Sequence, residues 1–253
     1  MTAEHVTVER DGDRATVSLD RPAKSNALTG GMFGRLCEIF TDLGDEDVSV
    51  VTVRGRGGDF SAGVDMAGVP EWVEMPPLEV RDALEEVHDA LRAIEDLGAP
   101  VVAALEGHVL GGGLELALAC DIRIARQNAV FGLPESEMGL SMDLGGAQKL
   151  PGMIGEGMTK YLIMTGESID ADRAYDIGLI EECHPDGAFE DAIAATEESL
   201  ASKPTYVHDI AKRQVHSARP PNLDEAMQQS IHHAVSAYHE PETQRRVEEF
   251  FED

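Results

Sequence analysis

The chain has 253 residues, with 48 Asp or Glu against 20 Lys or Arg, so its formal net charge is -28 at pH 7. This length allows one substantial core, or one core with an appended helical part. The acidic residues are spread over every segment, and such a surface repels nucleic acids and anionic membranes, so we expect neither as a partner. No apolar run reaches membrane-spanning length, because the strongest, residues 101–105, ends at Glu106.

In the N-terminal half, apolar residues alternate or recur at spacings that predict alternating strands and helices. Asp11-Gly12-Asp13 separates two strand-like segments and predicts a hairpin, and Thr29 is expected to cap the first helix. The expected hairpin strands are 5–9 and 14–20, followed by a helix at 29–43 and a strand at 48–54. A glycine-rich loop at 55–63, a helix at 78–97 and a strand at 101–105 are expected next.

Three consecutive glycines, residues 111–113, stand directly before an apolar helix predicted over 114–119, which is followed by a strand at 121–125. Backbone N–H groups at a helix N-terminus, with no side chain in the way, stabilise negative charge on an oxygen. Glu115 lies in the first turn, and Glu135 follows twenty residues later in the sequence FGLPE. Alone, the glycines also fit close helix packing, and Glu115 also fits a carboxylate beside the helix dipole. Together they suit enolate stabilisation with proton transfer or water addition.

Beyond Gly145 the pattern is almost wholly helical. Helices are expected at 186–202, 205–218 and 223–251, the last broken at Pro241, with a hinge at 220–221. We therefore predict an α/β protein with its active site in a core over residues 1–195 and a helical oligomerisation region over 196–253.

Six blocks of this sequence resemble the crotonase, or enoyl-CoA hydratase/isomerase, superfamily. They are, in order between Arg21 and Cys183, RPAKSNAL, DFSAGVDM, LGGGLELALACDIRIA, FGLPE, GGAQKLPGMIG and LIMTGESIDADRAYDIGLIEEC. The resemblance implies a spiral of ββα repeats whose C-terminal helices build homotrimers, commonly paired into hexamers. It also implies an acyl-CoA thioester as substrate, with no cofactor beyond the coenzyme A of that substrate.

The same resemblance assigns the site. The backbone N–H groups of Val64 and Gly112 would form an oxyanion hole, and Glu115 and Glu135 fall where hydratases hold and activate water. The residues expected to line the substrate are Lys24, Ala62, Gly63, Val64, Asp65, Met66, Gly111 and Gly112. The coenzyme A phosphates would be held by Arg21, Lys24, Arg54, Arg56 or a base of a neighbouring subunit.

Asp143 departs from the hydratase pattern. Hydratases follow the second glutamate with Gly-x-x-Pro-Gly, whereas this chain has Gly-Leu-Ser-Met-Asp over residues 139–143. This resembles the dienoyl-CoA isomerases, in which the matching aspartate and glutamate shuttle a proton between distant carbons, although that branch has aspartate in place of Glu115. We therefore favour hydration, with isomerisation second and acyl-CoA binding without turnover third. Asp143 is either catalytic or the cap of a helix that begins near Gly145.

Three features complete the predictions. The segment 66–75 contains Gly68 and Pro70 and is expected to be a loop that forms a flexible wall over an acyl pocket, with core filling as the alternative role for Trp72. The three cysteines and nine histidines show no disulfide or metal spacing, so no metal site is expected. The acidic N-terminal residues do not fit a signal peptide, which predicts a cytoplasmic protein, and five lysines beside so many carboxylates predict a halophilic one.

Overall fold

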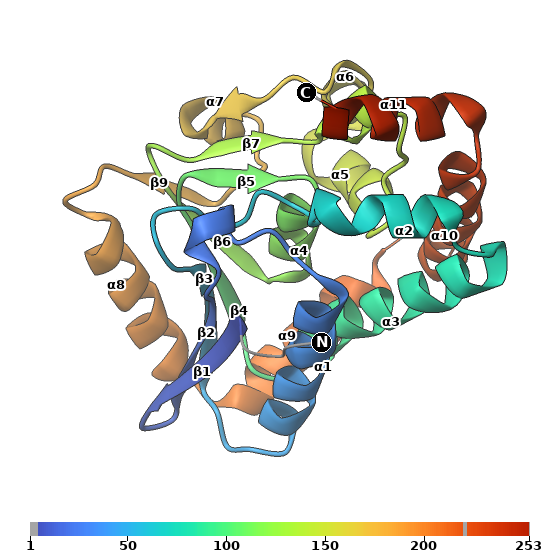
Figure 1. The fold of residues 1–253 in the computed structure, drawn as a ribbon. Helices are drawn as coiled ribbons and strands as arrows, with labels where there is room; N and C mark the ends of the chain where they lie inside the picture. Colours follow the sequence, from blue (N-terminus) through green and yellow to red (C-terminus); the bar gives the residue numbers. More distant parts are fainter. Residues whose placement is uncertain (1–4, 220–221, 253) are drawn as a thin grey trace.

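A computed structural model describes residues 5–219 and 222–252, so the hinge predicted at 220–221 lies outside the described residues. Its centre is a six-stranded sheet in the order β1-β2-β3-β4-β6-β9 (Figure 1). Only the β1–β2 pair is antiparallel, and this is the predicted hairpin. The strands span Val6–Asp11, Arg14–Leu19, Val50–Gly55, Val101–Leu105, Ile122–Arg126 and Glu182–His184.

Helices bury both faces of this sheet. On one face, Val50, Val102 and Ile124 pack with Phe189 of α8 (Phe189–Ala201). On the other face, neighbours such as Val51 belong to the main core with α1 (Gly30–Gly44) and α3 (Pro77–Asp96). Because strands covered on both faces favour apolar residues at every position, β4 is a continuous apolar run, whereas β3 is interrupted by Thr52 and Arg54.

A second sheet of three short strands, in the order β5-β7-β8, makes the chain a spiral. β4 is followed by β5 (His108–Leu110) and α4 (Gly112–Ala119), and β6 by β7 (Val130–Gly132), the 3-10 helix η4 (Pro134–Met138) and α5 (Gly146–Ile154). Isolated β-bridges join Ser61 to Val109 of β5 and Leu28 to Val64. The segment that follows β3 therefore also runs beside the second sheet. The predicted spiral of ββα repeats is confirmed.

The segment 66–75 is helical, so its description as a flexible loop was wrong. It forms the 3-10 helix η3 (Met66–Gly68) and then α2 (Val69–Glu74). Pro70, taken as a loop signal, stands in the first turn of α2, where a missing N–H costs no hydrogen bond. Trp72 packs against the core, with its ring centroid 5.7 Å from that of Tyr238.

Helices make up most of the C-terminal part, as predicted. The remaining elements are η2 (Pro22–Lys24), α6 (Glu156–Thr165), β8 (Ile169–Asp170), α7 (Ala171–Asp176), α9 (Thr205–Ser217), α10 (Leu223–Tyr238) and α11 (Pro241–Glu252). Pro241 begins α11, so the break expected at this residue is confirmed. The division predicted at residue 195 falls inside α8, a helix that packs on the large sheet.

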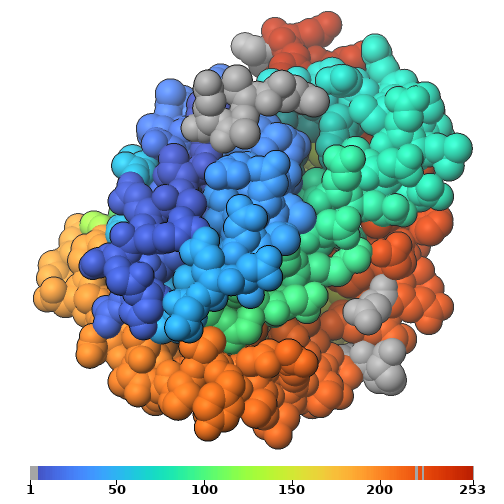
Figure 2. Space-filling view, turned by 90° about the horizontal axis from the view of Figure 1, so that it is seen from below, coloured from blue at the N-terminus to red at the C-terminus, as the bar shows by residue number. Residues whose placement is uncertain are grey.

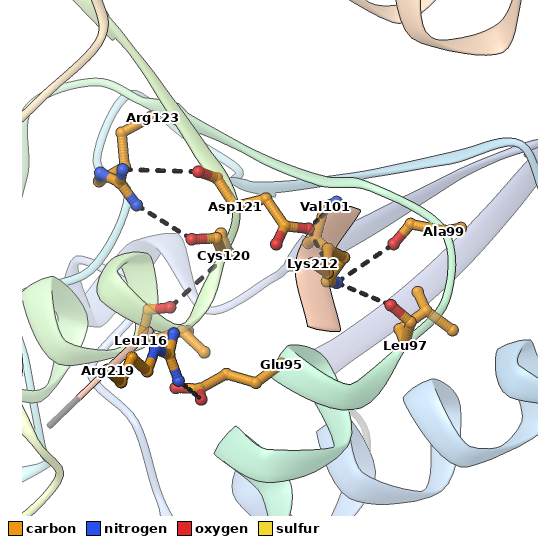
Figure 3. A network of polar contacts seen from close by, with 10 residues as sticks. All are labelled: Glu95, Leu97, Ala99, Val101, Leu116, Cys120, Asp121, Arg123, Lys212 and Arg219. Atoms are coloured by element: carbon orange, nitrogen blue, oxygen red, sulfur yellow. Dashed lines mark hydrogen bonds and ion pairs between the residues drawn. The ribbon is translucent and has the colours of Figure 1, made fainter. Parts of the chain in front are cut away.

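A largely buried lysine fixes α9 to the sheet (Figure 3). The Lys212 ammonium donates to the carbonyls of Leu97, at 2.7 Å, and Ala99, at 3.4 Å, and pairs with Asp121 at 2.9 Å. Asp121 also accepts the N–H of Val101 at 2.8 Å. Because Lys212 is almost withdrawn from solvent, removal of either charge would leave the other uncompensated, so this contact ties α9 to the starts of β4 and β6.

Helices from distant parts of the sequence share the face drawn in Figure 2, where blue α1 lies beside the green end of α3 and orange C-terminal segments adjoin them. On α9, Tyr206, Val207 and Ile210 are exposed apolar side chains. Trimer formation through the C-terminal helices stays a prediction.

Among the described helices, none combines the length and apolar character that crossing a membrane requires.

Candidate functional site

A cavity of about 330 Å³ gathers residues that are far apart in the sequence. Its walls come from the segment 62–69, the start of α4, the segment 134–143, and the helices α10 and α11. All five predicted catalytic residues line it: Val64, Gly112, Glu115, Glu135 and Asp143. Of the other predicted substrate contacts, Ala62, Gly63, Met66 and Gly111 line it, whereas Lys24 and Asp65 do not.

Two backbone N–H groups without a partner among the described residues belong to residues that line this cavity, Val64 and Gly112. Leu28 N donates to Gly63 O and Asp65 N to Leu28 O, so the Val64 N–H between them points away from Leu28. Within the described chain, neither this N–H nor that of Gly112, the first residue of α4, donates to a protein group. A Cβ built on Gly63 would lie 3.5 Å from Gly112 N, and one on Gly112 would lie 3.6 Å from Val64 N. The Val64 and Gly112 nitrogens therefore lie near each other at the cavity.

Glu115 is buried at the N-terminal end of α4, with 2% of its surface exposed. Its Oε1 accepts hydrogen bonds from the backbone N–H groups of Leu144, at 3.2 Å, and Gly146, at 2.7 Å. These bonds orient the carboxyl group and also satisfy an N–H in the first turn of α5. Burial, and then the charges of Glu135 and Asp143, raise the pKa of Glu115 well above its ordinary value.

The cap of α5 is Gly145, which makes no side-chain capping bond, so the interpretation of Asp143 as the helix cap is wrong. Glu115 supplies a side-chain oxygen to that helix instead. Asp143 is 8% exposed and lines the cavity. Burial and the charge of Glu135 raise the pKa of Asp143 to about 7.

Glu135 follows Pro134 at the start of η4 and reaches toward the glycine run. A Cβ on Gly111, where φ is +50°, would lie 2.8 Å from Glu135 Oε1, so a glycine makes room for the carboxyl group. Its Oε2 is buried with no hydrogen-bond partner among the described residues, and burial raises the pKa of Glu135 to about 7. Three carboxyl groups with raised pKa around one cavity hold a proton near neutral pH, which suits general acid and base catalysis.

The C-terminal helices contribute cavity residues that the sequence analysis missed. Tyr238, at the end of α10, is 6% exposed and lines the cavity, as does Phe250 of α11. The Tyr238 ring packs against Trp72 of α2. The sequence analysis assigned this region to oligomerisation alone, since nothing in the spacing connects residue 238 with residues near 70.

The same helices hold the segment that carries Glu135 and Asp143. Arg246 donates to Glu137 O and Thr243 Oγ1 to Gly139 O, both at 2.9 Å. Asp143 O accepts from His88 Nε2 of α3. Three side chains thus bind three carbonyl groups of residues 137–143, and we call these contacts the carbonyl clamp.

The chain is similar to known proteins along almost its whole length. The sequence profile described as enoyl-CoA hydratase/isomerase matches residues 10–253. The chain belongs to the enoyl-CoA hydratase/isomerase family. It is 34% identical over 230 residues to the short-chain-enoyl-CoA hydratase of Clostridium acetobutylicum, covering 90% of this chain and 87% of that protein. It is also 32% identical over 222 residues to the mitochondrial Delta(3,5)-Delta(2,4)-dienoyl-CoA isomerase of Rattus norvegicus, covering 83% and 68%.

Among solved structures, the chain is similar to a putative enoyl-CoA hydratase from Thermobifida fusca YX in complex with CoA. The TM-score is 0.78 with 27% identity, and the match covers 99% of this chain and 96% of that one. The crotonase superfamily predicted from the sequence is therefore confirmed, and so is its fold. Names from both the hydratase and isomerase branches occur among the relatives, so membership of the family does not choose the reaction.

Most of the bases predicted to hold coenzyme A phosphates are engaged in ion pairs. Arg21 pairs with Asp65 at 2.6 Å, Arg54 with Glu190 at 2.7 Å, and Arg56 with Glu9 and Asp20. Asp65 also caps η3 by accepting the N–H of Ala67, which explains why it points away from the cavity. Lys24 is exposed and forms no ion pair within the described part of the chain. No group of three or more His, Cys, Asp or Glu in that part is arranged to hold a metal ion.

Proposed function

We propose that this chain catalyses the addition of water across the 2,3 double bond of an enoyl-CoA thioester. The observation that carries the proposal is the presence of two glutamates, the buried Glu115 and the half-buried Glu135, in the same cavity as the free amides of Val64 and Gly112. Water addition needs a stabilised enolate oxygen, a base for the water and an acid for the α-carbon. This cavity holds a candidate group for each task.

In the proposed reaction, the thioester oxygen accepts hydrogen bonds from the two amides, each worth about 3 kcal/mol to the transition state. Glu115 and Glu135 hold the water between them. The ionised carboxylate removes a proton from the water as its oxygen bonds to C3, and the π electrons move toward the thioester oxygen. The protonated carboxyl group then gives its proton to C2. Because each charge disfavours ionisation of the other, the pair retains the proton that this exchange requires.

Isomerisation is the second candidate, favoured by the position of Asp143. This carboxyl group lines the cavity with a pKa of about 7 and does not cap α5. Glu135 and Asp143 would remove a proton from one acyl carbon and return it to another, which moves a conjugated pair of double bonds. The similarity to the rat dienoyl-CoA isomerase supports this candidate, whereas Glu115 in place of aspartate supports hydration.

The two reactions are separated by giving the purified protein crotonyl-CoA and a 3,5-dienoyl-CoA in turn, in molar KCl. Loss of enoyl absorbance with the first supports hydration, and a new absorbance from a diene conjugated with the thioester carbonyl supports isomerisation of the second. Glu135→Gln should lower either activity by at least about 100-fold while the variant still binds acyl-CoA, because it removes a proton-transferring group. Full activity in this variant contradicts the assigned roles. Binding without turnover of either thioester supports the third candidate, a non-catalytic acyl-CoA-binding protein.

The proposal also covers the assembly of the enzyme, its location, its partner and its cofactor requirement. We infer a homotrimer or homohexamer, a cytoplasmic location, an acyl-CoA thioester as the partner and no separate cofactor. The halophilic origin predicted from the net charge of -28 likewise stays a prediction.

A further inference from the structure

His88 is a buried histidine that contacts the main chain of the candidate site from outside the cavity. It lies on α3 with 1% of its surface exposed, and its Nε2 is hydrogen-bonded to the carbonyl oxygen of Asp143. Because a carbonyl oxygen only accepts hydrogen bonds, the ring carries its proton on Nε2. His88 is not among the residues that line the cavity, so any effect of this ring on the reaction passes through the main chain.

The carbonyl group that His88 binds belongs to the same peptide unit as an N–H that binds Glu115. The carbonyl of Asp143 and the N–H of Leu144 are the two polar groups of one planar peptide bond. Leu144 N donates to Glu115 Oε1 at 3.2 Å, beside the bond of 2.7 Å from Gly146 N. Because the unit is planar, a rotation that breaks the hydrogen bond at one end also moves the hydrogen bond at the other.

His88 is the main donor to this carbonyl group. Ser230 Oγ lies 3.4 Å from Asp143 O, but its single proton has a better acceptor in Met227 O, at 2.7 Å. The bond from Leu144 to Glu115 is at the long end of the usual range, so it is the weaker of the two that Glu115 accepts. It is therefore the bond more easily lost if the peptide unit turns.

The His88 ring is neutral in this position. Burial lowers the pKa of His88, and the hydrogen bond to Asp143 O acts against this effect. The charges of Arg92 and Lys149 lower the same pKa, and that of Asp89 raises it. Within the described chain, Nδ1 is buried without a partner, so a second proton there would find no acceptor. The other titratable groups around the polar cavity beside the ring are Glu95, Asp96, His216 and Arg219.

We propose that His88 is a positioning residue, which fixes the peptide unit between Asp143 and Leu144 and thereby keeps the Leu144 N–H directed at the Glu115 carboxyl group. A hydrogen bond accepted by the carbonyl also polarises the peptide unit and makes its N–H a stronger donor. The same contact fixes the main chain from which the Asp143 side chain enters the cavity. This inference rests on the proposed function, because that proposal gives Glu115 its task in the reaction.

The Leu144 N–H also affects the protonation of Glu115. Burial, and then the charges of Glu135 and Asp143, raise the pKa of Glu115. The N–H groups of Gly146 and Leu144 act in the opposite direction, because they stabilise the ionised carboxylate. Loss of the Leu144 bond therefore raises this pKa further. The other titratable side chains of the cavity wall are Glu137 and Tyr238.

The first experiment compares His88→Leu, which removes the donor, with His88→Gln, whose side-chain amide donates from nearly the same place. Activity is measured in molar KCl with whichever thioester the unmodified protein converts. His88→Leu should lower kcat about tenfold and change KM less than about twofold, because the contacts with substrate are untouched. His88→Gln should restore kcat to within about threefold of the original. His216→Leu, on α9 beside the same polar cavity, is the matched control and should leave kcat unchanged.

The second experiment does not require turnover. The carbon-13 signal of the Glu115 carboxyl group, identified by its loss in Glu115→Gln, is followed by NMR as the pH is changed. In His88→Leu the midpoint of this titration should move to higher pH by about 0.5 unit, because the ionised form has lost a donor. In His88→Gln and His216→Leu the midpoint should stay where it is in the unmodified protein.

An unchanged kcat in His88→Leu would overturn the inference, and so would an unchanged Glu115 midpoint. A His88→Gln variant as slow as His88→Leu would also overturn it, because the packing of the ring rather than its hydrogen bond would then matter. If the unmodified protein converts neither thioester, the proposed function fails. The NMR titration still decides in that case whether His88 positions Glu115.

Discussion

Replacing Asp143 by asparagine should stabilise the protein, and the stabilisation should increase with pH. Asp143 is 8% exposed and lies beside two other carboxyl groups, so its charged form is disfavoured in the folded state. Asparagine has nearly the same shape and never ionises. The substitution therefore removes the cost of this one charge while it preserves the packing.

The size of the effect follows from the pKa of about 7 in the folded state, against 3.8 as the ordinary value. Because the folded pKa is the higher one, the native state binds the proton more tightly, and stability is lost as pH rises through this window. At about 1.4 kcal/mol per pKa unit, the full penalty is about 4 kcal/mol. Between about pH 5 and pH 8.5 the difference between variant and original should grow by about 3 kcal/mol.

Urea unfolding at fixed molar salt and fixed protein concentration, repeated across this pH range, measures the difference. Asp176→Asn, at an exposed position on α7, serves as the matched control and should show little change with pH. The reasoning is refuted if the gap between Asp143→Asn and the original protein stays constant from the lowest to the highest pH. A gap that shrinks as pH rises would refute it more strongly, because the sign would be reversed.

Three further outcomes follow from the structure. Gly111→Ala should lower kcat by about 100-fold, because its Cβ would lie 2.8 Å from Glu135 Oε1. Gly34→Ala, in open space on α1, is the control and should leave kcat unchanged. Equal kcat values for the two variants would contradict the inference that Gly111 makes room for the Glu135 carboxyl group. Thr243→Val should lower the free energy of unfolding, measured with urea, by about 1 kcal/mol, because it removes the hydrogen bond to Gly139 O. It should also lower kcat more than it raises KM. An unchanged kcat would show that the carbonyl clamp does not affect catalysis. The free energy of unfolding should be larger in molar KCl than in dilute buffer, because salt screens the repulsion within a net charge of -28, and the reverse would refute the halophilic prediction.

The features predicted well from the sequence are those that depend on residues close to one another along the chain. The alternation around Gly12 predicts the hairpin, and the glycines at 111–113 place bare amides at a helix start. Glu115 sits among apolar residues in that helix, which predicts its burial. Each of these inferences uses neighbours within one or two turns of the chain.

What the sequence could not supply depends on contacts between distant residues. An aspartate three residues before a helix start suggests a cap, but Glu115, 31 residues before Gly146, binds the N–H of that residue instead. Tyr238 enters the cavity because α10 packs beside α3 and near α2, and no short-range pattern encodes that approach. The segment 66–75 contains Gly and Pro in positions that begin a helix as readily as they break one.

The carbonyl clamp holds the segment 135–143 in place while the pKa values of its carboxyl groups stay raised. Glu115, Glu135 and Asp143 repel one another whenever two are charged, so the segment 135–143 would be driven outward if burial alone held it. Hydrogen bonds from His88, Thr243 and Arg246 hold its main chain and leave its carboxyl groups free of neutralising partners. A salt bridge would hold the segment equally well but would lower those pKa values and remove the proton that the chemistry needs. The C-terminal helices therefore maintain a repulsive cluster in place without weakening its acidity and basicity near neutral pH.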